Sequence, residues 1–174
     1  PEQWVLDNAG MVFAAAEAYV NAGAQMVLTC TFGGTASRLR DAGLERRVYD
    51  VNRLAAQIAR QAARDRALVV GDIGPLGYLP ITLGAISYND AVSQFAEQAH
   101  ALADGGVNLF HIETMNDFKE VRAAIAGIRQ VSALPILVTW SFSEQGRTLT
   151  GITPAQAARE LAGLDIAAIG ANCG

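Results

Sequence analysis

The sequence predicts an α/β protein built on a parallel sheet, and three observations support this. First, five short apolar runs are rich in Val, Ile, Leu or Thr, as expected of strands buried on both faces; they span 25–32, 67–73, 107–114, 135–142 and 166–173. Second, segments with helical periodicity separate these runs, so strands and helices alternate. Third, the runs begin about every 30–40 residues, which suits repeated strand–helix–strand units with right-handed crossovers.

The predicted helices follow from apolar spacing and from residues typical of helix ends. The first spans 5–21 and stops before Gly23, since glycine commonly ends a helix. A second spans 51–64 and places apolar residues on one face. Three later helices have candidate starts with capping residues or proline at the first turn, namely Asn89-Asp90, Asp117 and Thr153-Pro154.

Alternation without an intervening linker predicts a single domain over residues 1–174. A complete (β/α)8 TIM barrel needs about 250 residues. We therefore expect a truncated barrel of about five strands, lacking its first strand and its last two or three. An open doubly wound sheet is the alternative, although no glycine-rich phosphate loop follows the first predicted strand.

Composition excludes several classes of protein. Hydrophobic residues make up 51% and charged residues 17% of the chain, as in a packed domain. The net charge is −4 without a Lys/Arg cluster, so no nucleic-acid partner is expected. No apolar run reaches the roughly 18 residues of a membrane span, and no signal peptide is evident. The only two cysteines, Cys30 and Cys173, suggest no disulfide framework and predict a reducing, cytoplasmic location.

Polar residues follow every apolar run, and in a parallel barrel these strand ends gather around one pocket. The five ends are 29–34, 71–75, 111–114, 139–142 and 170–174. A single polar end means little, but five in register indicate a shared site. The candidate site residues at these ends are Asp72, Glu113, Ser141, Asn172 and Cys173.

The ordered set of strand ends resembles the homocysteine S-methyltransferase family. The matches are Thr-x-Thr-Phe-Gly at 29–33, Ile-Gly-Pro at 73–75, Glu-Thr-x-x-Asp at 113–117, Ser-Phe at 141–142 and Gly-x-Asn-Cys-Gly at 170–174. The resemblance implies zinc-dependent methyl transfer to the thiol of homocysteine, which gives methionine. It implies homocysteine and a methyl donor as partners, the donor being a cobalamin- or folate-linked module, S-methylmethionine or betaine. A homo-oligomer or further domains are also compatible with it.

Cys173 is the predicted catalytic and metal-binding residue. A thiolate at a strand end can bind zinc, and the resemblance implies three cysteine ligands with the substrate thiol in the fourth position. Zinc lowers the pKa of a bound thiol, which then attacks as a thiolate. The chain contains no adjacent Cys-Cys pair, so the other two ligands are expected outside it and this chain alone is expected to be inactive. Cys30 is predicted to be half-buried and non-coordinating.

The other candidate residues are expected to bind the amino acid. Glu113 should point into the barrel mouth, where the resemblance implies contact with the α-ammonium of the substrate. His111 lies two residues earlier and should face the same interior. Asp72, Asn172 and Ser141 are the further predicted substrate contacts.

Three alternatives are left open by the sequence: another thiol S-methyltransferase, a different enzyme on the same barrel, and a non-catalytic barrel fragment or binding domain. Barrels host many chemistries, so the fold alone does not decide. An aldolase would need a Schiff-base lysine at a strand end, and Lys119 lies instead in a predicted helix.

Overall fold

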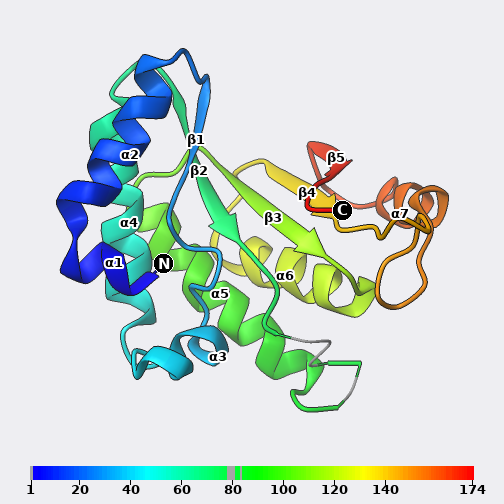
Figure 1. The fold of residues 1–174 in the computed structure, drawn as a ribbon. Helices are drawn as coiled ribbons and strands as arrows, with labels where there is room; N and C mark the ends of the chain where they lie inside the picture. The colour runs from blue at the N-terminus through cyan, green and yellow to red at the C-terminus, as the bar shows by residue number, and fades with distance from the viewer. Residues whose placement is uncertain (1, 78–80, 83) are drawn as a thin grey trace.

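The computed structural model describes residues 2–77, 81–82 and 84–174, and its centre is a five-stranded parallel sheet (Figure 1). Sheet order follows chain order, with every neighbouring pair parallel. A doubly wound sheet reverses direction at a switch point, and this order contains none. The sheet therefore winds in one direction, as in a (β/α)8 barrel. Its strands are β1 (Met26–Leu28), β2 (Leu68–Ile73), β3 (Leu109–Met115), β4 (Ile136–Trp140) and β5 (Ala168–Ala171).

Helices α4, α5 and α6 pack behind the sheet in Figure 1 and contact β1, β2 and β3. The predicted first helix is wrong in one respect, because it breaks at Asn8 into two helices. A short α-helix and a 3-10 turn after β1 were not predicted. The helices are α1 (Glu2–Asp7), α2 (Ala9–Asn21), α3 (Ala36–Leu39), η1 (Arg40–Ala42), α4 (Val48–Ala63), α5 (Tyr88–Asp104), α6 (Phe118–Val131) and α7 (Pro154–Leu161).

Side-chain caps set the starts of the last three helices. Asp117 accepts a hydrogen bond from the Lys119 backbone N–H, as predicted. Thr153 precedes α7, where a helix start was predicted, and forms a capping box with Gln156. The predicted Asn89-Asp90 cap of α5 is wrong, since the N-cap is Ser87. Its Oγ accepts from the Asp90 N–H at 3.1 Å, and its hydroxyl donates to the Asp90 carboxylate at 2.7 Å. Asp90 is therefore not the N-cap residue but lies in the first turn of the helix, where it is the hydrogen-bond partner of the N-cap Ser87.

The two faces of the sheet differ in their surroundings. Side chains facing the helices are buried, and Trp140 packs edge-on against Phe118 of α6 with ring centroids 4.9 Å apart. The opposite face is the barrel interior and carries the candidate polar residues. The expectation of burial on both faces is wrong for the outermost strands: Met26 of β1 and Ile169 of β5 are each 47% exposed. Within the described residues, each of these two strands has a neighbour on one side only.

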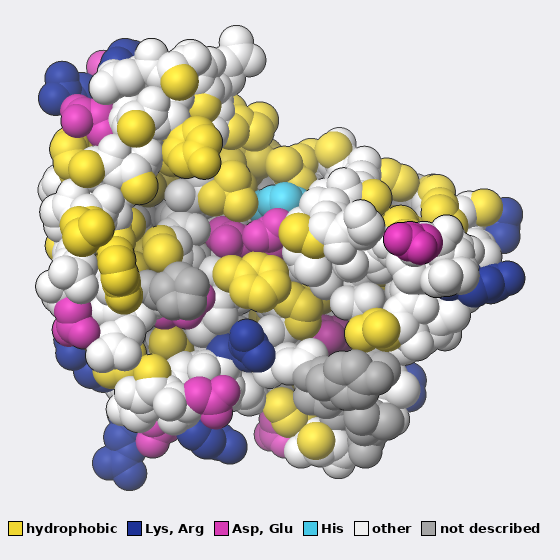
Figure 2. Space-filling model, in the orientation of Figure 1, with side chains coloured by type: hydrophobic (Ala, Val, Ile, Leu, Met, Phe, Trp, Pro, Cys, Tyr) yellow, Lys and Arg dark blue, Asp and Glu magenta, His cyan; other side chains and the backbone are white. Residues whose placement is uncertain are grey.

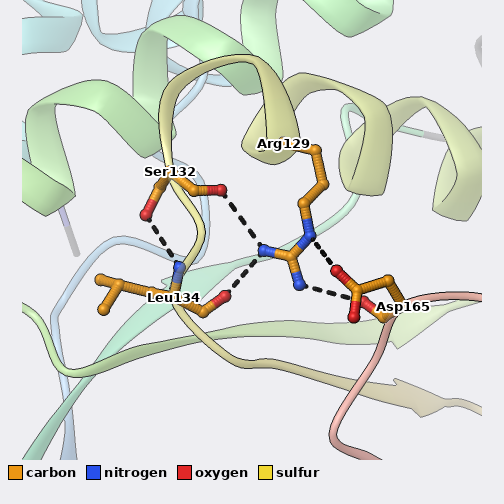
Figure 3. A network of polar contacts seen from close by, with 4 residues as sticks. All are labelled: Arg129, Ser132, Leu134 and Asp165. Atoms are coloured by element: carbon orange, nitrogen blue, oxygen red, sulfur yellow. Dashed lines mark hydrogen bonds and ion pairs between the residues drawn. The ribbon is translucent and has the colours of Figure 1, made fainter.

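Arg129 joins the end of α6 to the strands that carry the site (Figure 3). Its Nη1 donates to the carbonyl oxygens of Ser132 at 3.3 Å and Leu134 at 2.7 Å. Its Nε donates to the Asp165 carboxylate at 2.8 Å, and its Nη2 to the Asp165 carbonyl at 3.0 Å. These bonds link the segment before β4 to the segment before β5, so one side chain helps align the two strands.

A buried carboxyl group ties the chain after β2 to α6. Glu120 is 1% exposed, and its Oε1 accepts from the Leu76 N–H at 2.7 Å. Nearby, the Thr82 hydroxyl donates to the Asp117 carboxylate. The pKa of Glu120 is raised to about 7, because burial and the charge of Asp117 together outweigh the opposing effect of the Leu76 hydrogen bond.

Glu120 should make stability fall as the pH rises. Its pKa is about 7 in the fold against an ordinary 4.5, so the neutral side chain stabilises the fold fully below pH 4.5, and this contribution is lost by about pH 7. Glu120→Gln keeps an acceptor for Leu76 and cannot ionise. Relative to the wild type, we expect the substitution to increase the free energy of unfolding at pH 8 by about 2–3 kcal/mol more than it does at pH 4. Urea denaturation of both proteins at the two pH values measures this difference. An equal change at both pH values would contradict this.

Candidate functional site

Asn172 connects the ends of β3 and β5 across the end of β4. Its Nδ2 donates to Glu113 Oε2 and to Thr114 Oγ1, both at 2.9 Å. Its Oδ1 accepts from the Thr114 N–H at 3.2 Å. Thr114 has a φ of +60° beside a register irregularity in β3, a conformation that costs a β-branched residue about 1–3 kcal/mol. Asn172 therefore holds a strained strand end in place and orients Glu113.

Cys173 lies next to Asn172 on an exposed turn after β5. Its φ is +51°, and Asn172 Nδ2 donates to its Sγ at 3.5 Å. The Ser141 hydroxyl donates to the Cys173 carbonyl oxygen at 2.9 Å. A side chain at Gly174 would collide with the carbonyl oxygen of Phe142, so glycine is required there. The turn lines a hollow of about 300 Å³ formed by Phe142, Ala171, Asn172, Cys173 and Gly174.

Asp72 lies on β2 and faces the barrel interior, where it is 6% exposed. Its pKa is raised to about 9, first by burial and then by the charge of Glu113, a side-chain hydrogen bond with Glu113 and the charge of Glu2. Its Oδ1 has no hydrogen-bond donor among the described residues. These effects favour the protonated form of Asp72, which lies beside a second carboxyl group.

The backbone of Asp72 is anchored by a buried polar network. Its N–H donates to Thr29 Oγ1 at 2.9 Å, and its carbonyl accepts from Thr31 Oγ1 at 2.7 Å. Gln98 of α5 donates to the Thr31 carbonyl at 2.8 Å and approaches the Asp72 carbonyl at 3.4 Å. The sequence interpretation missed Gln98. Its signal was a polar residue on the apolar stripe of a helix, between Phe95 and Leu102.

The hydrogen-bond partner of His111 is Thr139 on the neighbouring strand rather than Glu113. Its Nε2 lies 2.9 Å from Thr139 Oγ1 on the neighbouring strand. Burial lowers its pKa, while the charge of Glu113 opposes that shift. It faces the interior, as predicted, and is neutral at physiological pH. Figure 2 shows acidic side chains beside a histidine in the hollow of this face.

Cys30 lies after β1, at the opposite edge of the sheet from Cys173. Its thiol is free and half-buried, as predicted, and burial raises its pKa, with Glu2 adding to the rise. It borders an apolar groove of about 720 Å³ between α2, β1 and α4, away from the polar strand ends. Its environment favours the neutral thiol over a metal-binding thiolate.

The donors within the described residues fit zinc only in part. Cys173 offers one exposed sulfur on a turn. Residues 2–77, 81–82 and 84–174 contain no cluster of three or more His, Cys, Asp or Glu side chains arranged to hold a metal ion. A catalytic zinc site needs three protein ligands, so two would have to come from residues that this structure does not describe.

None of the described helices has the length and hydropathy of a membrane span.

The structure brings the predicted residues into two linked groups. Asp72, Glu113 and Asn172 meet at the ends of β2, β3 and β5, whereas Ser141 contacts the backbone of Cys173. Asn172 belongs to both groups through its contact with the Cys173 sulfur. The arrangement places a carboxyl pair, suited to a cation, next to a turn that presents a sulfur.

Comparison with known proteins identifies relatives of the chain. Residues 2–174 match the family described as homocysteine S-methyltransferase. The chain is 33% identical over 168 residues to methionine synthase of Mycobacterium leprae (strain TN) and 32% identical over 168 residues to that of Mycobacterium tuberculosis (strain ATCC 25618 / H37Rv). Each alignment covers 89% of this chain and 14% of the relative, so the chain spans about one seventh of their length.

Solved structures share the fold. The homocysteine methyltransferase MmuM of Escherichia coli superposes in its oxidized form with a TM-score of 0.84 at 21% identity, covering 98% of this chain and 64% of that one. The metallated form gives 0.84 at 20% identity, covering 98% and 65%. Five strands and their helices thus adopt the arrangement of that larger protein.

Proposed function

The chain belongs to the homocysteine S-methyltransferase family, and we propose that the full-length protein transfers a methyl group to the thiol of homocysteine, giving methionine. The observation that carries this proposal is the group formed by Glu113, Asn172 and Cys173. In it, one amide contacts both a carboxylate and a strand-end sulfur. A carboxylate suits the ammonium of an amino acid, and the nearby sulfur suits a metal that binds its thiol.

The described residues have distinct proposed roles. Glu113 and Asp72 would contact the α-ammonium of homocysteine, because they form the acidic group of the barrel interior. Asn172 would orient Glu113 and contact the substrate. The Ser141 hydroxyl donates to the Cys173 carbonyl, so Ser141 would fix the position of the turn that carries Cys173. Ser141 would also contact the substrate. Holding the amino acid by its charged end limits the directions in which its thiol can point.

Cys173 is the proposed zinc ligand of this chain, and zinc would lower the pKa of the substrate thiol when bound. The proposal includes residues outside those described, since Cys173 alone cannot hold the metal. Residues 1–174 would form part of one barrel domain. A cytoplasmic location is proposed from the two free thiols, Cys30 and Cys173. A cobalamin or folate donor would require other modules.

Incubating the full-length protein with homocysteine and each candidate methyl donor tests the proposal. We expect methionine to form with one donor among methylcobalamin, methyltetrahydrofolate, S-methylmethionine and betaine. The matched control substrate is 4-mercaptobutanoate, which keeps the thiol and the carboxylate but lacks the ammonium group. Equal methylation of both would indicate another thiol S-methyltransferase. No methylation with any donor, in protein that contains zinc, would contradict the proposal.

A further inference from the structure

Asp72 and Glu113 form a carboxyl pair across adjacent strands of the barrel interior. The register of β2 and β3 pairs Asp72 with His111, so Glu113 stands two residues further along the same face. The charge of Glu113 and a side-chain hydrogen bond with Glu113 both raise the pKa of Asp72. Two ionised carboxylates at such close range would repel each other, so the pair favours holding one proton.

The surroundings place that proton on Asp72. Glu113 Oε2 already accepts a hydrogen bond from the Asn172 amide at 2.9 Å. Asp72 is 6% exposed, and no described residue donates to its Oδ1, which favours its neutral form. The pKa of Asp72, raised to about 9 by burial and by Glu113, agrees with this assignment.

We propose that an amino-acid ligand expels the shared proton when its ammonium group binds beside Asp72 and Glu113. The inference rests on the proposed function, which brings an ammonium to this end of the barrel. The O–H bond of Asp72 breaks, its electron pair stays on the oxygen, and the proton passes to water. The ammonium keeps its three hydrogens and donates to the two carboxylates, replacing the lost proton in both charge and hydrogen bonding.

The other titratable groups that face Asp72 and Glu113 are not expected to add a proton release of their own near neutral pH. These groups are His111 on β3, Cys30 after β1 and Glu2 on α1. Burial lowers the pKa of His111 from 6.5 and raises that of Cys30 from 9.0, so both pKa values move away from pH 7. The Glu2 side chain accepts from the Gly33 N–H at 2.6 Å and adds negative charge near Asp72.

Titration of the full-length protein with L-methionine tests the inference, because methionine has an ammonium group and no thiol proton. Calorimetry in two buffers of different ionisation enthalpy should show about one proton released per methionine at pH 7. Affinity should rise about tenfold per pH unit between pH 6.5 and 7.5. 4-(Methylthio)butanoate, which lacks the ammonium, should bind without releasing a proton.

Asp72→Asn should abolish the release and make methionine affinity independent of pH. Asp104→Asn is the matched control, since Asp104 is exposed and contacts Tyr49 and His100, and it should release the proton as the wild type does. Binding without release, or release that persists in Asp72→Asn, would overturn the inference alone. No methionine binding at any pH would overturn the proposed function as well. If Asp72→Asn does not fold, the wild-type pH profile decides.

Discussion

Replacing Cys173 by serine is expected to remove zinc from the full-length protein and to abolish methyl transfer to homocysteine. Cys173 presents its sulfur on an exposed turn, supported by Asn172 and by the Ser141 bond to its carbonyl. Losing a residue that only supports a metal ligand costs about 10–100-fold in metal affinity or activity. Losing the ligand itself should cost more than about a hundredfold. Metal content by atomic emission and methionine formation by chromatography measure both effects.

Cys30→Ser is the matched control for this substitution. Cys30 is at the other edge of the sheet, and burial raises the pKa of its thiol. Zinc content and activity should therefore stay at wild-type levels in Cys30→Ser. If Cys173→Ser retained stoichiometric zinc and full turnover, Cys173 would not be a ligand, and the zinc role proposed for the strand end would be wrong.

Glu113→Gln is expected to raise the KM for homocysteine by about thirtyfold to several hundredfold, with a smaller change in kcat. Removing one charge from a partly buried ion pair costs about 2–4 kcal/mol. The glutamine keeps an oxygen acceptor for the Asn172 amide, which in the wild type lies 2.9 Å from Glu113 Oε2. The strand end should therefore keep its shape, and the loss should fall on the ammonium contact. Steady-state kinetics at several homocysteine concentrations separate KM from kcat.

Two comparisons show whether a KM effect comes from charge at this position. Glu97→Gln removes a carboxylate from the exposed face of α5 and should leave KM unchanged. Glu113→Asp keeps the charge and should recover part of the lost affinity. An unchanged KM in Glu113→Gln would show that the ammonium binds elsewhere.

Most elements of the fold could be predicted because their signals are local. Each apolar run coincides with a strand to within a few residues, and Asp117 and Thr153 cap helices where their positions indicated. Errors arose where packing over longer range decides. Because the chain breaks at Asn8, α1 is a separate helix from α2, and its Val5 packs with Ala55 and Ile58 of α4. Periodicity along one segment cannot show such a turn.

The proximity of several candidate residues was also predictable, because parallel strands bring their ends together and parity decides which residues face inward. Glu113 and Asn172 meet as this rule implies. The reach of Asn172 across β4 to Thr114 and the positive φ of Thr114 were not predictable. Both depend on the local irregularity of β3, for which the residue pattern has no signature.

Periodicity and connectivity were enough to predict the order of the elements, the side chains that lie at the strand ends and the place of Cys173 after the fifth strand. The winding of the sheet was left open by the sequence, and the strand order of the structure decides it. The protonation of those side chains depends on the assembled fold. Asp72 holds a proton because it is buried beside Glu113, and a pKa is set by desolvation and neighbouring charges, which exist only once the strands are assembled.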